Sequence, residues 1–259
     1  MIKFFRQMRQ QVLKENSNKS SSGRAGRYLK YAIGEIILVV IGILIALQVN
    51  TWNENRKNRN KKDALLKAMQ VEFKNNLSQL DSVIYYDKLI VKSCERLLHM
   101  TEAAFSATPI DTMRILIQNT SWLWTFDARN GALRSGISSG EIHLIKNDSL
   151  VNFLFSWQDV VADAKENEDR TLDYRLASDP ILERFVRKVD YRRIHRPEMG
   201  ISKHESNYTA LMNDPLFEDY LAERLGHTAD ALIELLIVKE QNQAILEMID
   251  VELNKFNGK

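Results

Sequence analysis

Residues Tyr31–Val49 have the sequence YAIGEIILVVIGILIALQV, and this stretch decides the fold. Between Ala32 and Val49 only Glu35 and Gln48 are strongly polar. An α-helix rises about 1.5 Å per residue, so roughly 20 apolar residues cross a hydrocarbon core that is roughly 30 Å thick. The stretch therefore predicts a transmembrane helix. It is longer than the apolar part of a cleavable signal peptide, and no small-residue cleavage site follows it.

Aromatic side chains flank the apolar stretch on both sides. Tyr28 precedes it, Tyr31 opens it and Trp52 follows it. Tyr and Trp side chains favour the level of the lipid headgroups because their rings are amphipathic. We therefore divide the chain into a basic amphipathic N-terminal tail and linker (1–27), a transmembrane helix (28–52) and a helical soluble domain (53–259).

Four residues of the predicted span are candidate functional residues. Glu35 is a carboxylate inside an apolar run, and such groups usually mark function. It lies only about one turn inside the run, however, where it could also reach the headgroups or pair with a nearby cation. Gly34, Gly42 and Ala46 share one helical face, and small residues four apart let two helices approach closely. These four residues therefore predict either a helix–helix contact or an ion path in the membrane, with a structural role for Glu35 as the alternative.

The same region carries three short motifs in a fixed order. They are IGEI at Ile33–Ile36, LVVIGILIALQ at Leu38–Gln48 and NTWNE at Asn50–Glu54. A weaker fourth is ALRSGISSGEIHLIKNDSL at Ala132–Leu150. With these motifs the chain resembles an uncharacterised family of Bacteroidota membrane proteins, domain of unknown function 6090. The resemblance implies a single-pass envelope protein, and it brings no activity and no catalytic residues with it.

Composition limits the class of protein further. The chain has 259 residues, a formal net charge of +2 and a single cysteine. About 200 residues follow the span, which is enough for one domain with its own core. A net charge near zero argues against a nucleic-acid binder. A single Cys94 excludes an internal disulfide, and the sequence predicts no cofactor and no metal site.

Flanking charge sets the expected orientation. The short N-terminal tail is rich in Lys and Arg and holds a single acidic residue, Glu15. The positive-inside rule keeps such tails in the cytoplasm, whereas long domains cross the membrane largely regardless of charge. We expect an inner-membrane (plasma-membrane) protein with a cytoplasmic N-terminus and a periplasmic C-terminal domain.

Apolar periodicity predicts the helices of the domain. Residues 51–62 contain no helix breaker, so the span continues into the next helix as one rod. From Asp63 the apolar residues alternate in steps of three and four, typical of a bundle or coiled coil, with Asp87 as one interruption. We expect this helix to end near Pro109 and Asp111 to cap a short helix. The apolar positions are Leu66, Met69, Phe73, Leu77, Leu80, Ile84, Val91, Cys94 and Leu98.

Two further long helices follow. Asn147 is a predicted N-cap, because its side chain can accept a hydrogen bond from the first turn. A third long helix starts at Asp214-Pro215, since proline is favoured in a first turn. The predicted fold is all-α, with one N-terminal transmembrane helix that continues into an elongated antiparallel helical bundle.

An irregular stretch, Thr120–Asn147, is the candidate interaction surface of the domain. It holds Trp122 and Trp124 beside glycines, with Arg134 as a nearby charge. The alternative is that the tryptophans, with Phe126, simply close the end of the core. Two other groups of polar residues are expected to be solvated: the acidic face Glu166, Glu168 and Asp169, and the basic loop Arg187–Arg196 with His195. For the basic loop the alternative is contact with phosphates or lipid headgroups.

These observations support three hypotheses about function. The first is a helical extracytoplasmic interaction or assembly domain that forms a homo-oligomer. The second is a periplasmic sensor-like bundle that signals through an unidentified envelope protein. The third is an oligomeric membrane pore that uses Glu35. Because the sequence has no phosphate-binding loop, nucleophile elbow or HExxH motif, it gives no sign of an enzyme. The expected partners are the lipid bilayer, a second copy of the chain and that envelope protein, and not nucleic acid.

Overall fold

The computed structural model describes residues 24–257, so the predicted amphipathic tail lies largely outside the described residues. Helix α2 (Arg24–Leu98) is one unbroken helix of 75 residues. The predicted continuation of the apolar helix into the next helix is therefore confirmed. The chain divides into two units, Met1–Asn60 and Lys61–Lys259, and we call the second unit the body.

The first unit contains the apolar part of α2. Among the described residues, one helix is long and apolar enough to cross a membrane, and it lies near the N-terminus. Its apolar side chains are exposed, as a lipid-facing helix requires. Just after the apolar stretch, the Arg56 guanidinium lies over the Trp52 ring, 5.3 Å from the ring centroid.

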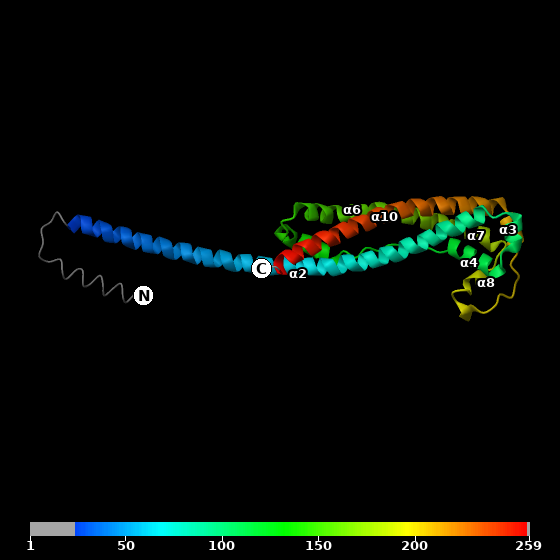
Figure 1. The fold of residues 1–259 in the computed structure, drawn as a ribbon, viewed down its shortest axis with the longest axis horizontal. Helices are drawn as coiled ribbons and strands as arrows, with labels where there is room; N and C mark the ends of the chain where they lie inside the picture. The colour runs from blue at the N-terminus through cyan, green and yellow to red at the C-terminus, as the bar shows by residue number, and fades with distance from the viewer. Residues whose placement is uncertain (1–23, 258–259) are drawn as a thin grey trace. The chain divides into compact units, whose positions relative to one another are not determined.

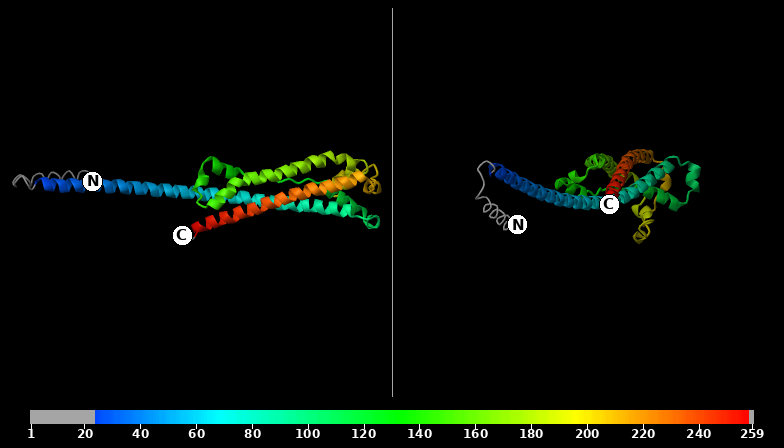
Figure 2. Two further views of the ribbon diagram at one scale, coloured as in Figure 1. Left: turned by 90° about the horizontal axis from the view of Figure 1, so that it is seen from above. Right: turned by 60° about the vertical axis from the view of Figure 1, so that its left-hand side comes forward.

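The body is built on three long helices (Figure 1). Two cross-helix contacts, Lys239–Asp81 at 2.7 Å and Lys62–Glu252 at 3.2 Å, show that the last helix runs antiparallel to α2. Both views in Figure 2 agree with this direction. The predicted all-α bundle is confirmed. The three helices are the part of α2 from Lys61 to Leu98, α6 (Asp148–Ala177) and α10 (Pro215–Asn257).

Short elements connect the long helices at the two ends of the body. The short elements are α3 (Glu102–Ala107), α4 (Ile110–Thr120), α5 (Gly131–Ser138), η1 (Glu141–Leu144), α7 (Asp179–Glu183), α8 (Lys188–Arg192), η2 (Pro197–Met199) and α9 (Tyr208–Met212). At one end, α5 and η1 lie between the segment that follows α4 and the start of α6. The other short elements lie at the opposite end, where α2 and α6 end and α10 begins (Figure 1). No β-strand occurs in residues 24–257.

An extended segment after α4 decides the direction of α6. It returns along α2, so α6 starts at the same end as the body part of α2 and runs parallel to it. Asn76 of α2 donates to the Arg129 carbonyl (2.8 Å) and accepts from the Arg129 N–H (2.9 Å). With its amide oriented to match, Gln79 pairs in the same way with both backbone groups of Asp127. The side chains of α2 thus replace the neighbouring strand that an extended backbone normally needs.

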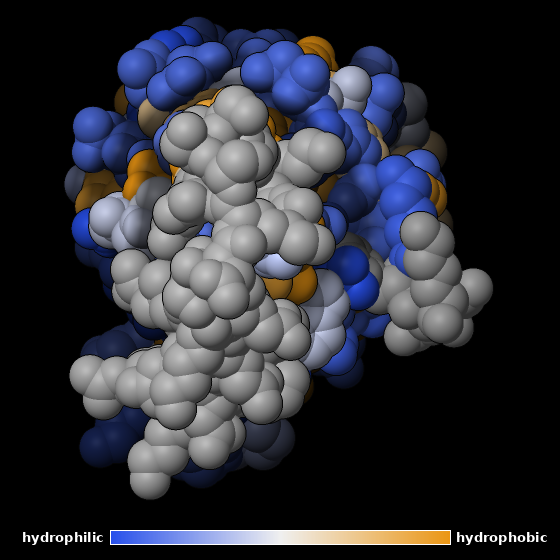
Figure 3. All heavy atoms as spheres, turned by 90° about the vertical axis from the view of Figure 1, so that its left-hand side faces the viewer, coloured by the Kyte–Doolittle hydropathy of each residue, from blue (hydrophilic) through white to orange (hydrophobic). Residues whose placement is uncertain are grey.

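The body has two apolar cores. The first consists of apolar residues from Leu65 to Ile84 of α2 together with residues of α5, η1, α6 and the C-terminal part of α10. The other gathers Ile90 to Leu97 of α2 with α4, α7, α8, α9 and the start of α10. Where part of the body is seen in Figure 3, hydrophilic side chains predominate and hydrophobic ones form smaller patches. This distribution is ordinary for a water-facing helical surface.

A buried polar layer that includes Asp87 lies between the two cores. The predicted positions of the α2 seam differ from those in the structure. Asp87 was expected to interrupt the apolar seam of α2, but it is only 5% exposed and occupies a seam position. Asn76, Ile90 and Leu97 are buried where Leu77, Val91 and Leu98 were expected, and these last three are half-buried. The seam therefore continues through Asp87.

Two predicted helix boundaries are also wrong. Helix α2 ends at Leu98 rather than near Pro109, because the Thr101 hydroxyl accepts from the Ala104 N–H (3.2 Å) and starts α3. Asp111 does not cap α4. It lies in the first turn, where its carboxylate pairs with Arg114 at 2.8 Å. Pro109 occupies the cap position instead. The other two predicted starts are confirmed, since Asn147 caps α6 and α10 begins at Pro215.

Candidate functional site

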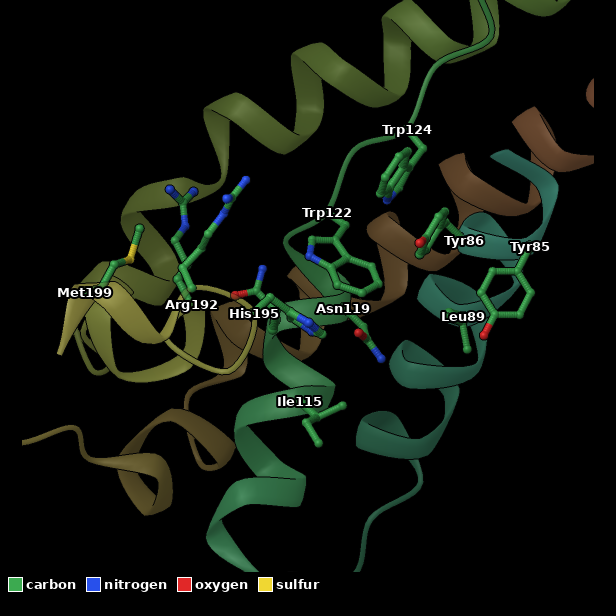
Figure 4. Close-up of a pocket in the computed structure, with 12 residues that line it drawn as sticks. Tyr85, Tyr86, Leu89, Ile115, Asn119, Trp122, Trp124, Arg192, His195 and Met199 are labelled. Carbon is green, nitrogen blue, oxygen red and sulfur yellow. The ribbon is translucent and has the colours of Figure 1, made fainter. Parts of the chain in front are cut away.

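A pocket of about 730 Å³ opens in the body beside the second core. Helix α2 contributes Tyr85, Tyr86 and Leu89, and helix α4 contributes Ile115, Gln118 and Asn119. The segment after α4 adds Trp122 and Trp124, and the segment from α8 to η2 adds Arg192, His195, Arg196 and Met199. Residues that are far apart in the sequence therefore meet around one cavity (Figure 4).

Aromatic rings form one side of the pocket. The rings of Tyr86 and Trp124 stack, with centroids 4.0 Å apart and planes 5° apart. Trp122 meets Tyr86 edge to face at 5.4 Å, and the ring of His195 lies 5.1 Å from Trp122 on its other side. Ring pairs in these arrangements attract beyond simple burial. The four rings thus form a continuous, preorganised surface.

Two buried arginines hold the backbone that carries the tryptophans. Arg224 of α10 is 1% exposed, donates from Nε to the Thr120 carbonyl (3.1 Å) and also donates to the Trp122 carbonyl. Arg175 of α6 donates from Nε to the Ser121 carbonyl (2.8 Å). Charged donors make stronger hydrogen bonds than neutral ones. The position of Trp122 is therefore fixed by α6 and α10 together.

A buried carboxylate holds the far end of the same segment. Glu168 of α6 accepts from the Phe126 N–H at 2.8 Å. Glu168 is 3% exposed, so the prediction that it belongs to a solvated face is wrong, although Glu166 and Asp169 are exposed. Burial raises the pKa of Glu168 to about 7, against the hydrogen bond from Phe126. Trp122 and Trp124 therefore lie between the two buried arginines and the buried Glu168, which hold the two ends of this segment.

Asp87 and Arg224 are both buried, and the charge of each affects the pKa of the other. Burial raises the pKa of Asp87 to about 7, although the Arg224 guanidinium acts to lower it. Burial also lowers the pKa of Arg224. The charge of Asp87 in turn helps to raise the pKa of Glu168. The polar layer under the pocket thus contains two carboxyl groups that titrate near neutral pH.

An ion pair between α4 and α8 holds the helix that carries Arg192. Asp190 of α8 accepts from Arg114 of α4 (2.8 Å) and from the Tyr208 hydroxyl (2.6 Å). Burial alone would raise the pKa of Asp190, but the hydrogen bonds from Tyr208 and Ser206 and the Arg114 charge lower it. Asp190 therefore stays ionised and fixes α8, from which Arg192 reaches the pocket.

The charged side chains that line the pocket are basic. Two arginines and no carboxylate line the pocket. Gln118 is 6% exposed, and its Oε1 atom accepts no hydrogen bond in the described part of the chain. Within residues 24–257 no cluster of three His, Cys, Asp or Glu side chains could hold a metal ion. Cys94 is buried beneath, and burial raises its pKa to about 12, which keeps the thiol protonated and unreactive.

Comparison with known proteins gives a match to a family of unknown function. Residues 35–156 match the model of this family, DUF6090. The resemblance expected from the sequence motifs is thereby confirmed over this part of the chain. No curated protein and no solved structure matches the chain. The DUF6090 region includes the aromatic side of the pocket and ends before Arg192, so the basic side lies outside it.

The predicted site residues fall in three places. Trp122 is half-buried and Trp124 is 39% exposed, and both line the pocket, whereas Phe126 is buried in the core. Arg134 is exposed on α5 and does not line the pocket. Gly34, Glu35, Gly42 and Ala46 are exposed on α2 in the first unit.

Most of the pocket could not be predicted from the sequence. Arg192, His195 and Arg196 belong to a loop that was expected to be solvated, with contact to phosphates or lipid headgroups as the alternative. The Tyr85-Tyr86 pair was the available signal, because two adjacent tyrosines flank the apolar seam without belonging to it. Their exposed fractions differ, since Tyr85 is 58% exposed and Tyr86 is half-buried against Trp124.

Proposed function

We propose that this protein is a single-pass membrane protein whose helical body is a recognition module of the sensor type. The pocket beside the second core carries the proposal. Its volume of about 730 Å³ lies in the range that holds small molecules, and its lining combines stacked rings with a few polar groups. Binding sites of small ligands have this composition, and the described residues of the body hold no cluster of three His, Cys, Asp or Glu side chains that could bind a metal ion.

Helix α2 supports the sensor role. It supplies Tyr85, Tyr86 and Leu89 to the pocket and also contains the whole apolar segment near the N-terminus. A ligand that contacts Tyr86 would act directly on this helix. Small shifts of a helix are one way in which proteins transmit binding. We propose that an envelope protein partner carries the signal onward.

Binding by the pocket can be tested on the full chain in lipid nanodiscs. A small-molecule library is screened by the shift in melting temperature, and each hit is repeated with Trp122→Ala. Phe155→Ala is the matched control, because Phe155 is an aromatic residue on α6 that is 46% exposed outside the pocket. Hits that vanish with Trp122→Ala and survive Phe155→Ala support the proposal. A library without any such hit would refute it.

The proposed topology places the N-terminus in the cytoplasm and the body in the periplasm, with the span in the inner membrane. The basic tail supports this orientation. The native Cys94 is buried and stays protonated, so it leaves a quiet background for cysteine labelling. A membrane-impermeant maleimide added to spheroplasts should modify Asp230→Cys in the exposed surface of α10 and leave Ser20→Cys untouched. The reverse pattern would invert the topology.

Self-association through the span is the second candidate. An added Cβ at Gly34 or Gly42 would meet no atom within 4 Å, so this face of the helix is open to a second copy. Cross-linking in membranes should yield an oligomer that Gly42→Leu weakens. Purely monomeric product would exclude it. Glu35 as a pore residue remains a prediction that bilayer conductance of Glu35→Gln would test.

A further inference from the structure

The pocket has a charge and shape that define the class of its ligand, and the inference rests on the proposed function. Figure 4 shows Arg192 and Met199 on one side of Trp122, with Tyr86 and Tyr85 on the other. The cavity therefore has a basic side and an aromatic side, joined by the Trp122 ring. A ligand that fills both sides needs a flat apolar part and a negative charge.

The arginines on the basic side of the pocket are available for a ligand anion. Within residues 24–257 the Arg196 side chain has one ion pair, with Glu198 at 3.8 Å, and both of these side chains are more than two-thirds exposed. Such exposed pairs contribute little and exchange readily with a better partner. No described carboxylate pairs with Arg192. A ligand anion between these two guanidinium groups would therefore gain charge-assisted hydrogen bonds without breaking a strong contact.

The Gln118 side chain adds a polar requirement. Its Oε1 atom is buried at the pocket wall and accepts no hydrogen bond from any described residue, which is costly for a buried acceptor. A ligand with an N–H or O–H group could satisfy it. The stacked rings of Tyr86 and Trp124 meanwhile provide a flat apolar surface of the kind on which a planar ring packs.

We propose that the pocket binds a planar aromatic anion that carries a hydrogen-bond donor on its ring system. The ring lies against Trp122 and Tyr86, the anionic group lies between Arg192 and Arg196, and the ring donor pairs with Oε1 of Gln118. Carboxylate and phosphate headgroups share this chemistry, and the ring distinguishes the ligand from free inorganic anions.

The ligand side of the proposal can be tested without any mutation. Isothermal titration of the full chain in nanodiscs compares indole-3-acetate with tryptophol, its neutral alcohol, and with acetate and inorganic phosphate. We expect indole-3-acetate to bind about ten-fold tighter than tryptophol, as one charge-assisted contact of about 1.4 kcal/mol implies. Acetate and phosphate should not bind measurably. Equal affinity for the acid and the alcohol would overturn the proposal.

The protein side uses variants that change one feature each. Arg192→Gln should remove most of the preference for the acid over the alcohol. Arg170→Gln is the control, because it removes the same charge from an exposed site on α6 outside the pocket. If both variants lower the affinity equally, the effect is general electrostatics and the assignment of Arg192 fails.

Gln118→Leu tests the ring donor. The native chain should prefer indole-3-acetate to its N-methyl derivative, and Gln118→Leu should abolish that preference while leaving the acid-over-alcohol preference intact. An unchanged preference would disprove the role of Gln118. Should library hits bind the pocket while no aromatic anion does, this inference fails and the recognition function stands. A chain that binds nothing refutes both.

Discussion

The polar layer between the two cores should make the body less stable as the pH rises toward neutral. Asp87 and Glu168 both have a pKa of about 7 in the folded chain, against ordinary values of 3.8 and 4.5. Between the ordinary value and about 7 the folded chain holds protons that the unfolded chain has released. The free energy of unfolding therefore falls through this window and is lowest above it.

The magnitude follows from the same pKa values. Between pH 5.5 and pH 8 each carboxyl accounts for a loss of roughly 2 kcal/mol, since most of its titration in the folded state falls inside this interval. For a domain of about 200 residues, 1 kcal/mol corresponds to a change of about 2–4 °C in melting temperature. We therefore expect the melting temperature to fall by about 4–8 °C for each carboxyl.

The assay is thermal unfolding of the full chain in nanodiscs, followed by tryptophan fluorescence at the two pH values. Glu168→Gln keeps an acceptor for the Phe126 N–H and removes the charge, so it should remove about half of the pH dependence. Asp87→Asn should do the same. Glu166→Gln, an exposed neighbour on the same helix, should leave the dependence unchanged. Equal melting temperatures of the native chain at both pH values would refute the reasoning.

Three further predictions concern stability and use the same melting assay. Gly136→Ala should destabilise the body by about 1–2 kcal/mol, because the added Cβ would lie 2.8 Å from the buried Leu65 side chain. Gly131→Ala is the control and should be neutral or stabilising, because its Cβ would lie 3.6 Å from the nearest side chain. A stabilising Gly136→Ala would contradict the packing. Asn242→Leu should stabilise the body by about 1–3 kcal/mol, because Asn242 is fully buried and neither polar atom of its amide has a hydrogen-bond partner among the described residues. A large loss of stability would reveal a missed contact. Glu72→Ala should lower the stability of the body by about 1–3 kcal/mol, because the Glu72 carboxylate accepts hydrogen bonds from the Ala132 and Leu133 N–H groups at the start of α5. An unchanged stability would show that these hydrogen bonds are not needed.

Local sequence signals predicted the elements well. The unbroken apolar run, the cap at Asn147 and the Asp-Pro pair at Asp214 act within one or two turns of helix, so neighbouring residues decide them. The end of α2 was missed because the Thr101 side chain competes with the helix that precedes it. That outcome depends on how the following residues pack and not on the local pattern.

The burial of polar groups could not be predicted from the pattern. Asp87 and Glu168 resemble solvated residues of amphipathic helices, and only the bundle places both in its interior. From the sequence we expected an antiparallel bundle and did not predict that α6 runs parallel to the body part of α2. This direction depends on the extended segment that Asn76 and Gln79 hold along α2.

The sequence by itself determined that a long apolar helix leads into an all-α body, since hydrophobic periodicity is a property of neighbouring residues. Only the tertiary structure decided the pocket, because Tyr86, Trp122 and Arg192 come from three separate segments. Their meeting depends on buried charges, above all Arg224, which hold the connecting backbone from other helices. Such contacts join residues about a hundred positions apart, and no local pattern records them.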